Sequence, residues 1–171
     1  MRYFLKLCLM ATLILFSFQF SHAMGQSFFF TENSLVGEKA PVFKLNLLSS
    51  GKEVSLTDYR NNQPAIIFYW ATWCPHCREE LKYLNENSAQ FETKGIKIIL
   101  VDLGDNANQV KAYVKKNGIK FDTFLDEQSS SADDYGIVGV PTFFFLDKDG
   151  TIQQVEHSLP DDYEKVLKLK T

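Results

Sequence analysis

Continuous apolar runs along the chain predict the strands of a buried sheet. Residues 65–70 (AIIFYW) and 142–146 (TFFFL) contain almost no polar side chain, and 96–101 (IKIILV) is interrupted only once. Runs of this length without a polar face are typical of strands that are covered on both sides. Shorter apolar stretches predict four further strands, at 42–45, 54–56, 121–125 and 152–155.

Turn residues indicate which of these strands are neighbours. The segment 49–52 (SSGK) predicts a turn between the first two short strands, and 147–150 (DKDG) predicts a turn with glycine at its end. Loops of this length and composition join antiparallel strands. We therefore expect one β-hairpin at the N-terminal side of the domain and a second hairpin near its C-terminus.

Apolar residues at helical spacing predict three helices. The first presents Leu81, Leu84 and Phe91; the second presents Val110, Tyr113 and Val114 and stops at Gly118; the third opens at Pro160 and presents Tyr163, Val166, Leu167 and Leu169. Strands and helices in this order predict an α/β fold, in which a mixed central sheet is flanked by helices on both faces.

The first 23 residues have the three parts of a secretory signal peptide. Arg2 and Lys6 precede an apolar run over 7–20, and small residues follow at 21–23. A transmembrane helix needs about 20 apolar residues, so this run is short for one. We predict a signal peptide over 1–23, an extended leader over 24–34 and one exported domain over 35–171. An uncleaved membrane anchor is the alternative, and it exports the domain as well.

Length, charge and cysteine count narrow the function. The 171 residues suit one domain, and the net charge of −3 gives no basic excess for a phosphate backbone, which disfavours nucleic-acid binding. Three cysteines are too few for a disulfide framework or a Cys₄ zinc site. Cys8 lies in the predicted signal peptide, so the exported chain keeps Cys74 and Cys77. An oxidising compartment allows these two to form a disulfide.

Two residues separate Cys74 from Cys77 at the start of a predicted helix, directly after a buried strand. Unpaired backbone N–H groups and the helix dipole stabilise a thiolate at Cys74, which makes it a nucleophile. Cys77 lies deeper in the helix and is better placed to attack a mixed disulfide. Pro75 stiffens the first turn, and a protonated His76 adds positive charge beside the sulfur. The pattern predicts thiol–disulfide exchange.

Simpler interpretations of the cysteine pair carry less weight. A zinc site needs further soft ligands, and the exported chain offers only His76 and His157. A purely structural disulfide across so small a loop constrains little of the unfolded chain.

Pro141 stands at the entry of a predicted central strand, where proline removes a donor from the ladder. A cis bond before Pro141, in a turn that serves a site, explains this placement. An ordinary trans proline at a strand start is the alternative.

Residues 70–77 (WATWCPHC), together with Val140-Pro141-Thr142, resemble the thioredoxin superfamily. The opening 37–43 (GEKAPVF), the N-terminal hairpin and the DKDG turn narrow the resemblance to the TlpA/ResA-like exported thiol–disulfide oxidoreductases. The resemblance covers about residues 35–168, and it implies a thioredoxin-like domain with an N-terminal β-hairpin.

The resemblance also implies roles for single residues. Cys74 corresponds to the attacking cysteine and Cys77 to the resolving cysteine. Pro141 matches the cis-proline that faces the disulfide, and the backbone of Val140 would hydrogen-bond an extended substrate segment. The cysteine pair then carries the two electrons, so no bound cofactor is implied.

Glu80 matches an acidic residue near the active site of ResA-like members. It lies about one helical turn beyond Cys77, where a partly buried carboxyl has a raised pKa and can shuttle protons for the dithiol. A solvated helix carboxylate beside Glu79 is the alternative. Trp73 is expected to pack beside the site as a lid, whereas Trp70 is expected to pack within its strand.

The residues between the cysteines depart from the reducing TlpA-like pattern. Pro75-His76 is similar to the dipeptide of DsbA-type oxidases, in which a charged histidine stabilises the thiolate and hence the reduced form. Such couples lie near −120 mV, against about −270 mV for thioredoxin. Because Glu79 and Glu80 can offset the histidine, we favour a reductase and keep the oxidase as the alternative.

Two other functions are known for similar folds, and the residues of this chain fit each of them less well. Peroxidases with the same opening hairpin need Pro and Thr seven and three residues before the reactive cysteine, and this chain has Ile67 and Ala71 there. A copper-delivery protein of this fold would use a wider cysteine spacing and a distal histidine, whereas His157 falls on the second arm of a predicted hairpin.

We expect a monomer that acts on protein thiols or disulfides, such as apocytochrome c, with a separate redox partner, for which a membrane protein is one candidate.

Overall fold

The structure is a computed structural model that describes residues 33–169. The predicted signal peptide (1–23) and nearly all of the predicted leader (24–34) lie outside this range. Within the described part of the chain, no helix is both long and apolar enough to cross a membrane.

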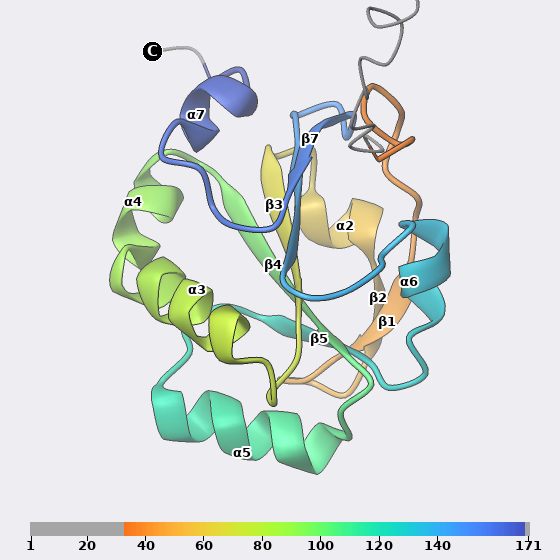
Figure 1. Ribbon diagram of the computed structural model, residues 1–171, viewed down its shortest axis with the longest axis vertical. Coiled ribbons are helices and arrows are strands. Elements are labelled where there is room, and N and C mark those ends of the chain that lie inside the picture. Colours follow the sequence, from red (N-terminus) through yellow and green to blue (C-terminus); the bar gives the residue numbers. More distant parts are fainter. Residues whose placement is uncertain (1–32, 170–171) are drawn as a thin grey trace, which may run out of the picture. The chain divides into compact units, whose positions relative to one another are not determined.

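One mixed sheet organises the described part of the chain, with strand order β2-β1-β5-β4-β3-β6-β7. The strands are β1 (Lys44–Leu47), β2 (Glu53–Ser55), β3 (Ala65–Trp70), β4 (Lys97–Leu103), β5 (Thr123–Asp126), β6 (Thr142–Leu146) and β7 (Ile152–Glu156). β3, β4 and β5 run parallel, and the two expected hairpins, β1–β2 and β6–β7, form the two ends of the sheet (Figure 1).

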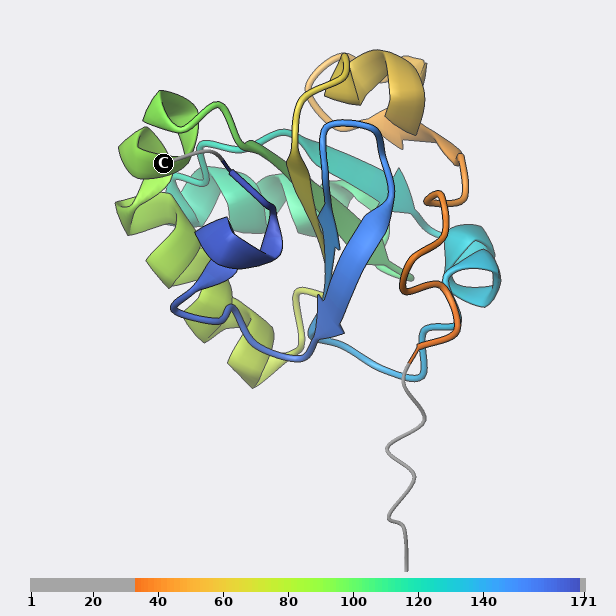
Figure 2. The same cartoon turned by 90° about the horizontal axis from the view of Figure 1, so that it is seen from above.

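Helices cover both faces of this sheet, as the sequence predicts. The helices are α2 (Leu56–Arg60), α3 (Pro75–Glu86), α4 (Ser88–Thr93), α5 (Ala107–Asn117), α6 (Ser130–Asp134) and α7 (Tyr163–Val166). α3, α4, α5 and α7 pack on one face, and the short helices α2 and α6 lie on the other (Figure 2).

The alternation of side chains along β3 divides the core into two clusters. Ile66, Phe68 and Trp70 point toward α3 and α5, whereas Ile67 and Tyr69 point toward α2 and α6. All six residues of β3 are fully buried, because both faces of this strand are covered. Trp70 therefore packs within the strand, as expected.

Several predicted boundaries were wrong. Leu56 is not the last residue of a strand but the first residue of α2, because Ser55 caps a new helix there through the Asp58 N–H. The first predicted helix is two helices, α3 and α4, separated at Asn87. The last predicted helix begins at Tyr163 instead of Pro160 and is only four residues long.

Two helices were missed by the periodicity because each is only five residues long. Asp126, at the end of β5, accepts the backbone N–H groups of Ser130 and Ser131 and so fixes the start of α6. Tyr135 follows α6 and is fully buried against Tyr69 and Phe144. This packing closes the second face of the sheet.

Candidate active site

Cys74 and Cys77 form a disulfide at the point where β3 passes into α3. Cys74 is the N-cap residue of α3, and its Sγ accepts the N–H of Cys77 at 3.1 Å. Pro75 occupies the first turn, where a missing N–H leaves no gap in the helical hydrogen bonds. Cys74 is 3% exposed, whereas Cys77 is fully buried.

This position favours a thiolate at Cys74 once the disulfide is reduced. α3 has twelve residues, and the Cys77 N–H in its first turn donates to the Cys74 sulfur. Partial positive charge at a helix N-terminus stabilises an anion there and lowers the pKa of a thiol. Cys77 has no access to solvent, so an incoming disulfide meets Cys74 first.

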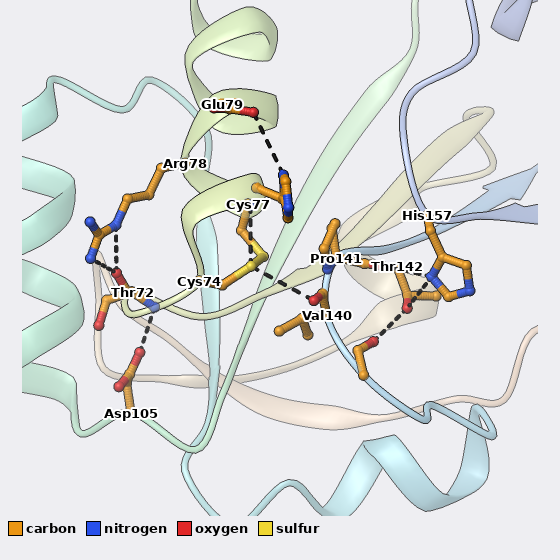
Figure 3. The surroundings of a disulfide bond; sticks show 12 residues. Thr72, Cys74, Cys77, Arg78, Glu79, Asp105, Val140, Pro141, Thr142 and His157 are labelled. Carbon is orange, nitrogen blue, oxygen red and sulfur yellow. Dashed lines mark hydrogen bonds and ion pairs between the residues drawn. A yellow bond between two sulfur atoms is a disulfide. The ribbon is translucent and has the colours of Figure 1, made fainter.

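Thr72 lies in the loop before the disulfide, and both its backbone N–H and its carbonyl are hydrogen-bonded to side chains. The carboxylate of Asp105 accepts the Thr72 N–H at 2.7 Å. The guanidinium of Arg78 donates to the Thr72 carbonyl from Nε at 2.9 Å and from Nη2 at 2.7 Å (Figure 3). Sequence reasoning missed both residues, because this contact joins the end of β4 to the start of α3.

The proline turn faces the disulfide from a distant part of the sequence. The Val140–Pro141 peptide bond is cis, and the carbonyl oxygen of Val140 lies 3.7 Å from Sγ of Cys74. Figure 3 shows Val140 and Pro141 facing the disulfide across this contact. The structure thus brings together Cys74, Cys77, Val140 and Pro141.

The side chain of His76 is exposed and lies beside Glu79. Its Nδ1 lies 3.7 Å from Oε2 of Glu79, and both side chains are more than 80% exposed. When His76 is protonated, the carboxylate of Glu79 offsets part of its charge. One of the two acidic neighbours named from the sequence is therefore placed to counter the histidine.

Glu80 is half-buried next to the connection between β7 and α7. Its Oε2 accepts the N–H of Leu159 at 3.4 Å. Burial raises the pKa of the Glu80 carboxyl, the Leu159 N–H opposes this, and the negative charge of Glu79 adds to it. A carboxyl with a raised pKa takes up a proton closer to neutral pH than an ordinary glutamate does.

Trp73 differs from the expectation. Its side chain is 65% exposed, so most of the indole is open to solvent and does not form a lid over the site. Val138, before the proline turn, is also fully exposed.

A second acidic residue lies beneath the site and was not identified from the sequence. Asp102, near the end of β4, is fully buried and pairs in register with Trp70. Neither carboxyl oxygen has a hydrogen-bond partner among the described residues. Burial, followed by the charge of Asp105, raises the pKa of Asp102 to about 8. An aspartate inside a run of buried apolar residues was the available signal.

His157 lies at the site rather than on the hairpin. β7 ends at Glu156, and Nδ1 of His157 lies 2.9 Å from the carbonyl oxygen of Pro141. The prediction that His157 lies on the second arm of the hairpin was therefore wrong, because the strand ends one residue earlier. In residues 33–169, no three or more His, Cys, Asp or Glu side chains form a group able to hold a metal ion.

Comparison with known proteins agrees with this geometry. Residues 36–155 match the AhpC/TSA family. The thiol-disulfide oxidoreductase ResA of Bacillus cereus is 32% identical over 83% of this chain and 82% of its own length. ResA of Geobacillus thermodenitrificans is 34% identical over 74% of this chain and 73% of its own length.

Solved structures show the same fold. A putative thiol:disulfide interchange protein DsbE from Chlorobium tepidum superposes with a TM-score of 0.68 at 25% identity, covering 78% of this chain and 94% of its own. The thioredoxin domain of a Bacteroides vulgatus thiol-disulfide oxidoreductase gives 0.68 at 26% identity, covering 79% and 98%. The thioredoxin-like fold predicted from the sequence is thus confirmed. This chain belongs to the AhpC/TSA family and, within it, to the ResA-type thiol–disulfide oxidoreductases.

Proposed function

We propose that this protein is an exported reductase of protein disulfides that uses Cys74 and Cys77 as its dithiol. The observation that carries the proposal is the setting of Cys74. Its sulfur caps α3, the Val140 carbonyl lies in front of it, and Cys77 is buried behind it. This setting leaves one sulfur for attack and one for resolution.

The reaction begins with the reduced protein. The Cys74 thiolate attacks one sulfur of a substrate disulfide, a Cys74–substrate bond forms, and the other substrate sulfur leaves as a thiolate that takes up a proton. Cys77 then loses its proton and attacks Sγ of Cys74. The Cys74–Cys77 disulfide forms, the second substrate thiol leaves, and two electrons have passed to the substrate.

Three further residues serve these steps in the proposal. Glu80, with its raised pKa, accepts the proton of the Cys77 thiol. The backbone of Val140 pairs with an extended segment of the substrate next to Pro141. The exposed side chain of Trp73 offers apolar surface to that segment instead of covering the site.

The direction of electron flow rests on the charge beside the sulfur. Glu79 lies 3.7 Å from His76, so the pair adds less positive charge than a lone histidine at this position. The thiolate of Cys74 is then less strongly stabilised, and the couple is more reducing. This supports reduction over the DsbA-like oxidation that the Pro75-His76 dipeptide suggests.

The midpoint potential of the Cys74–Cys77 couple tests this direction. We expect a value near that of thioredoxin, about −270 mV, when the domain is equilibrated with thiol/disulfide buffers. Glu79→Gln should make the couple more oxidising and His76→Ala more reducing, because the two charges oppose each other. A wild-type value near −120 mV would assign the oxidase function instead.

The cellular setting follows from the predicted export. We propose an extracytoplasmic monomer without a bound cofactor, reduced again by a separate thiol partner, for which a membrane protein is one candidate. Apocytochrome c is one candidate substrate. Reduction of a disulfide-bonded apocytochrome c by the reduced domain, compared with an unrelated disulfide protein, tests this choice.

A further inference from the structure

His157, the residue directly after β7, contacts the proline turn. Nδ1 of His157 lies 2.9 Å from the carbonyl oxygen of Pro141 and 3.4 Å from Oγ1 of Thr142. Figure 3 shows the imidazole beside these two residues, on the side of the turn away from the cysteines. The contact therefore reaches the turn without meeting the sulfur atoms.

The ladder between β6 and β7 explains why the turn needs this contact. The β6–β7 pairing ends at Phe143 opposite Glu156, and β6 itself begins at Thr142. The Pro141 carbonyl lies just beyond the end of this ladder, so it needs a donor from elsewhere. The side chain of the residue that follows β7 supplies that donor.

The partners also fix which ring nitrogen carries the proton. A carbonyl oxygen only accepts, so Nδ1 must be the donor to Pro141. The Thr142 hydroxyl donates its proton to the Gly139 carbonyl at 2.7 Å and leaves only a lone pair for the imidazole. Both neighbours thus require the Nδ1–H tautomer, and the contact persists when Nε2 gains a second proton.

We infer that His157 is a positioning residue for thiol–disulfide exchange, which holds the Val140–Pro141 turn in register for a polypeptide substrate. The Gly139–Thr142 hydrogen bond fixes one end of the turn, and the imidazole fixes the carbonyl that follows Pro141. The Val140 backbone between them is then presented beside Cys74. This inference rests on the proposed role of Val140 in substrate pairing, but not on the direction of electron flow.

The first test is spectroscopic and uses the unmodified protein. Long-range ¹H–¹⁵N NMR correlations identify the tautomer of His157 when the sample is at a pH at which the imidazole is neutral. We expect the Nδ1–H form, which is the opposite of the form that free histidine prefers. An Nε2–H tautomer would overturn the inference, whether or not the protein reduces disulfides.

The second test compares substrates and variants. His157→Leu removes the donor, whereas His157→Asn keeps an N–H at a similar position. We expect His157→Leu to lower the rate constant for reducing a disulfide-bonded synthetic peptide about fivefold, the effect of one lost hydrogen bond. His157→Asn and the exposed-neighbour control Ser158→Ala should stay near wild type. The rate constant with dithiobis(nitrobenzoate), which has no backbone to pair with Val140, should not change.

The outcomes separate this inference from the proposed function. Equal peptide rates in His157→Leu and wild type, or equal losses with both substrates, would overturn the positioning role. A wild-type protein that reduces neither substrate would overturn the proposed function alone, and the tautomer would still decide the inference. The tautomer also decides it if His157→Leu does not fold.

Discussion

At the scale of single residues, the two cysteines differ by their surroundings and not by their chemistry. Cys74 caps α3 beside the Val140 carbonyl, and Cys77 is fully buried one turn further along. A thiolate forms more readily at the helix N-terminus, because that end carries partial positive charge. The difference supports the proposed roles, in which Cys74 attacks and Cys77 resolves.

Substitution of each cysteine should therefore give a different defect. Cys74→Ser should abolish disulfide exchange, because no nucleophile remains at the accessible position. Cys77→Ser should still attack once and then accumulate as a mixed disulfide, which mass spectrometry of non-reduced samples detects. A stable mixed disulfide in Cys74→Ser instead would reverse the two roles.

Glu80 gives a prediction about pH. Its pKa is raised by burial, so the basic form that accepts a proton becomes available only above the usual range for glutamate. The exchange rate of the wild type should rise with pH through this raised pKa. Glu80→Gln should lose this rise and react about a hundredfold more slowly above it, at the lower end of the range that general-base catalysis contributes.

The neighbouring carboxylate provides the matched control. Glu79 is exposed and contacts His76, and its charge adds to the raised pKa of Glu80. Glu79→Gln should therefore keep the rise that Glu80 causes but move it to lower pH. Stopped-flow measurement of exchange across the pH range distinguishes the two variants. A profile that is unchanged in Glu80→Gln would leave Glu80 as a solvated helix carboxylate, which the sequence alone also allows.

At the scale of elements, α2 shows how a short helix supports a distant turn. Arg60, at the end of α2, is buried, and its Nη1 donates to the carbonyls of Gln63, Asp147 and Lys148. A Cβ at Gly150 would lie 2.9 Å from Nη2 of Arg60, and the φ of Gly150 is +82°. The β6–β7 turn therefore needs both the guanidinium and a glycine at this position.

Arg60→Ala should lower the free energy of unfolding by about 2 kcal/mol, since the hydrogen bonds from a charged donor to three carbonyls are lost. Urea denaturation of the oxidised domain measures this change. Lys52→Ala, at an exposed position in the β1–β2 loop, should leave the midpoint nearly unchanged. If Lys52→Ala lowers the free energy of unfolding as much as Arg60→Ala does, the loss comes from removing a positive charge and not from the hydrogen bonds of Arg60.

At the scale of the whole molecule, Asp102 links stability to pH. Its pKa is about 8 in the folded protein and near 3.8 when exposed, so the folded state binds the extra proton between these values. Because the folded state binds more protons than the unfolded state, stability falls as pH rises through this range. The contribution is complete below about pH 4 and is lost above about pH 8.

Asp102→Asn should flatten this dependence, because an amide at this buried position does not titrate. We expect the melting temperature of the variant to exceed that of the wild type at pH 8.5 and the difference to shrink toward pH 5. Thermal unfolding of the oxidised domain at a series of pH values measures it. A constant difference across the range would mean that Asp102 is already ionised when folded.

The sequence by itself determined the strands of the sheet and the pair of cysteines that forms the disulfide. The apolar runs at 65–70, 96–101 and 142–146 each became a buried strand, because only a strand covered on both faces tolerates such a run. Spacing placed Cys74 and Cys77 at the start of a helix, since capping and the first turn are local properties. The Val140–Pro141 turn was also marked by its sequence.

Only the tertiary structure decided what surrounds these residues. Thr72 is held by Asp105 from the end of β4, Pro141 by His157 from the end of β7, and Glu80 by the Leu159 N–H. Each partner lies between 16 and 79 residues away in the chain. No periodicity or propensity encodes such contacts, because they arise where separate strands end at the same edge of the sheet. Burial sets the pKa values of Glu80 and Asp102 for the same reason.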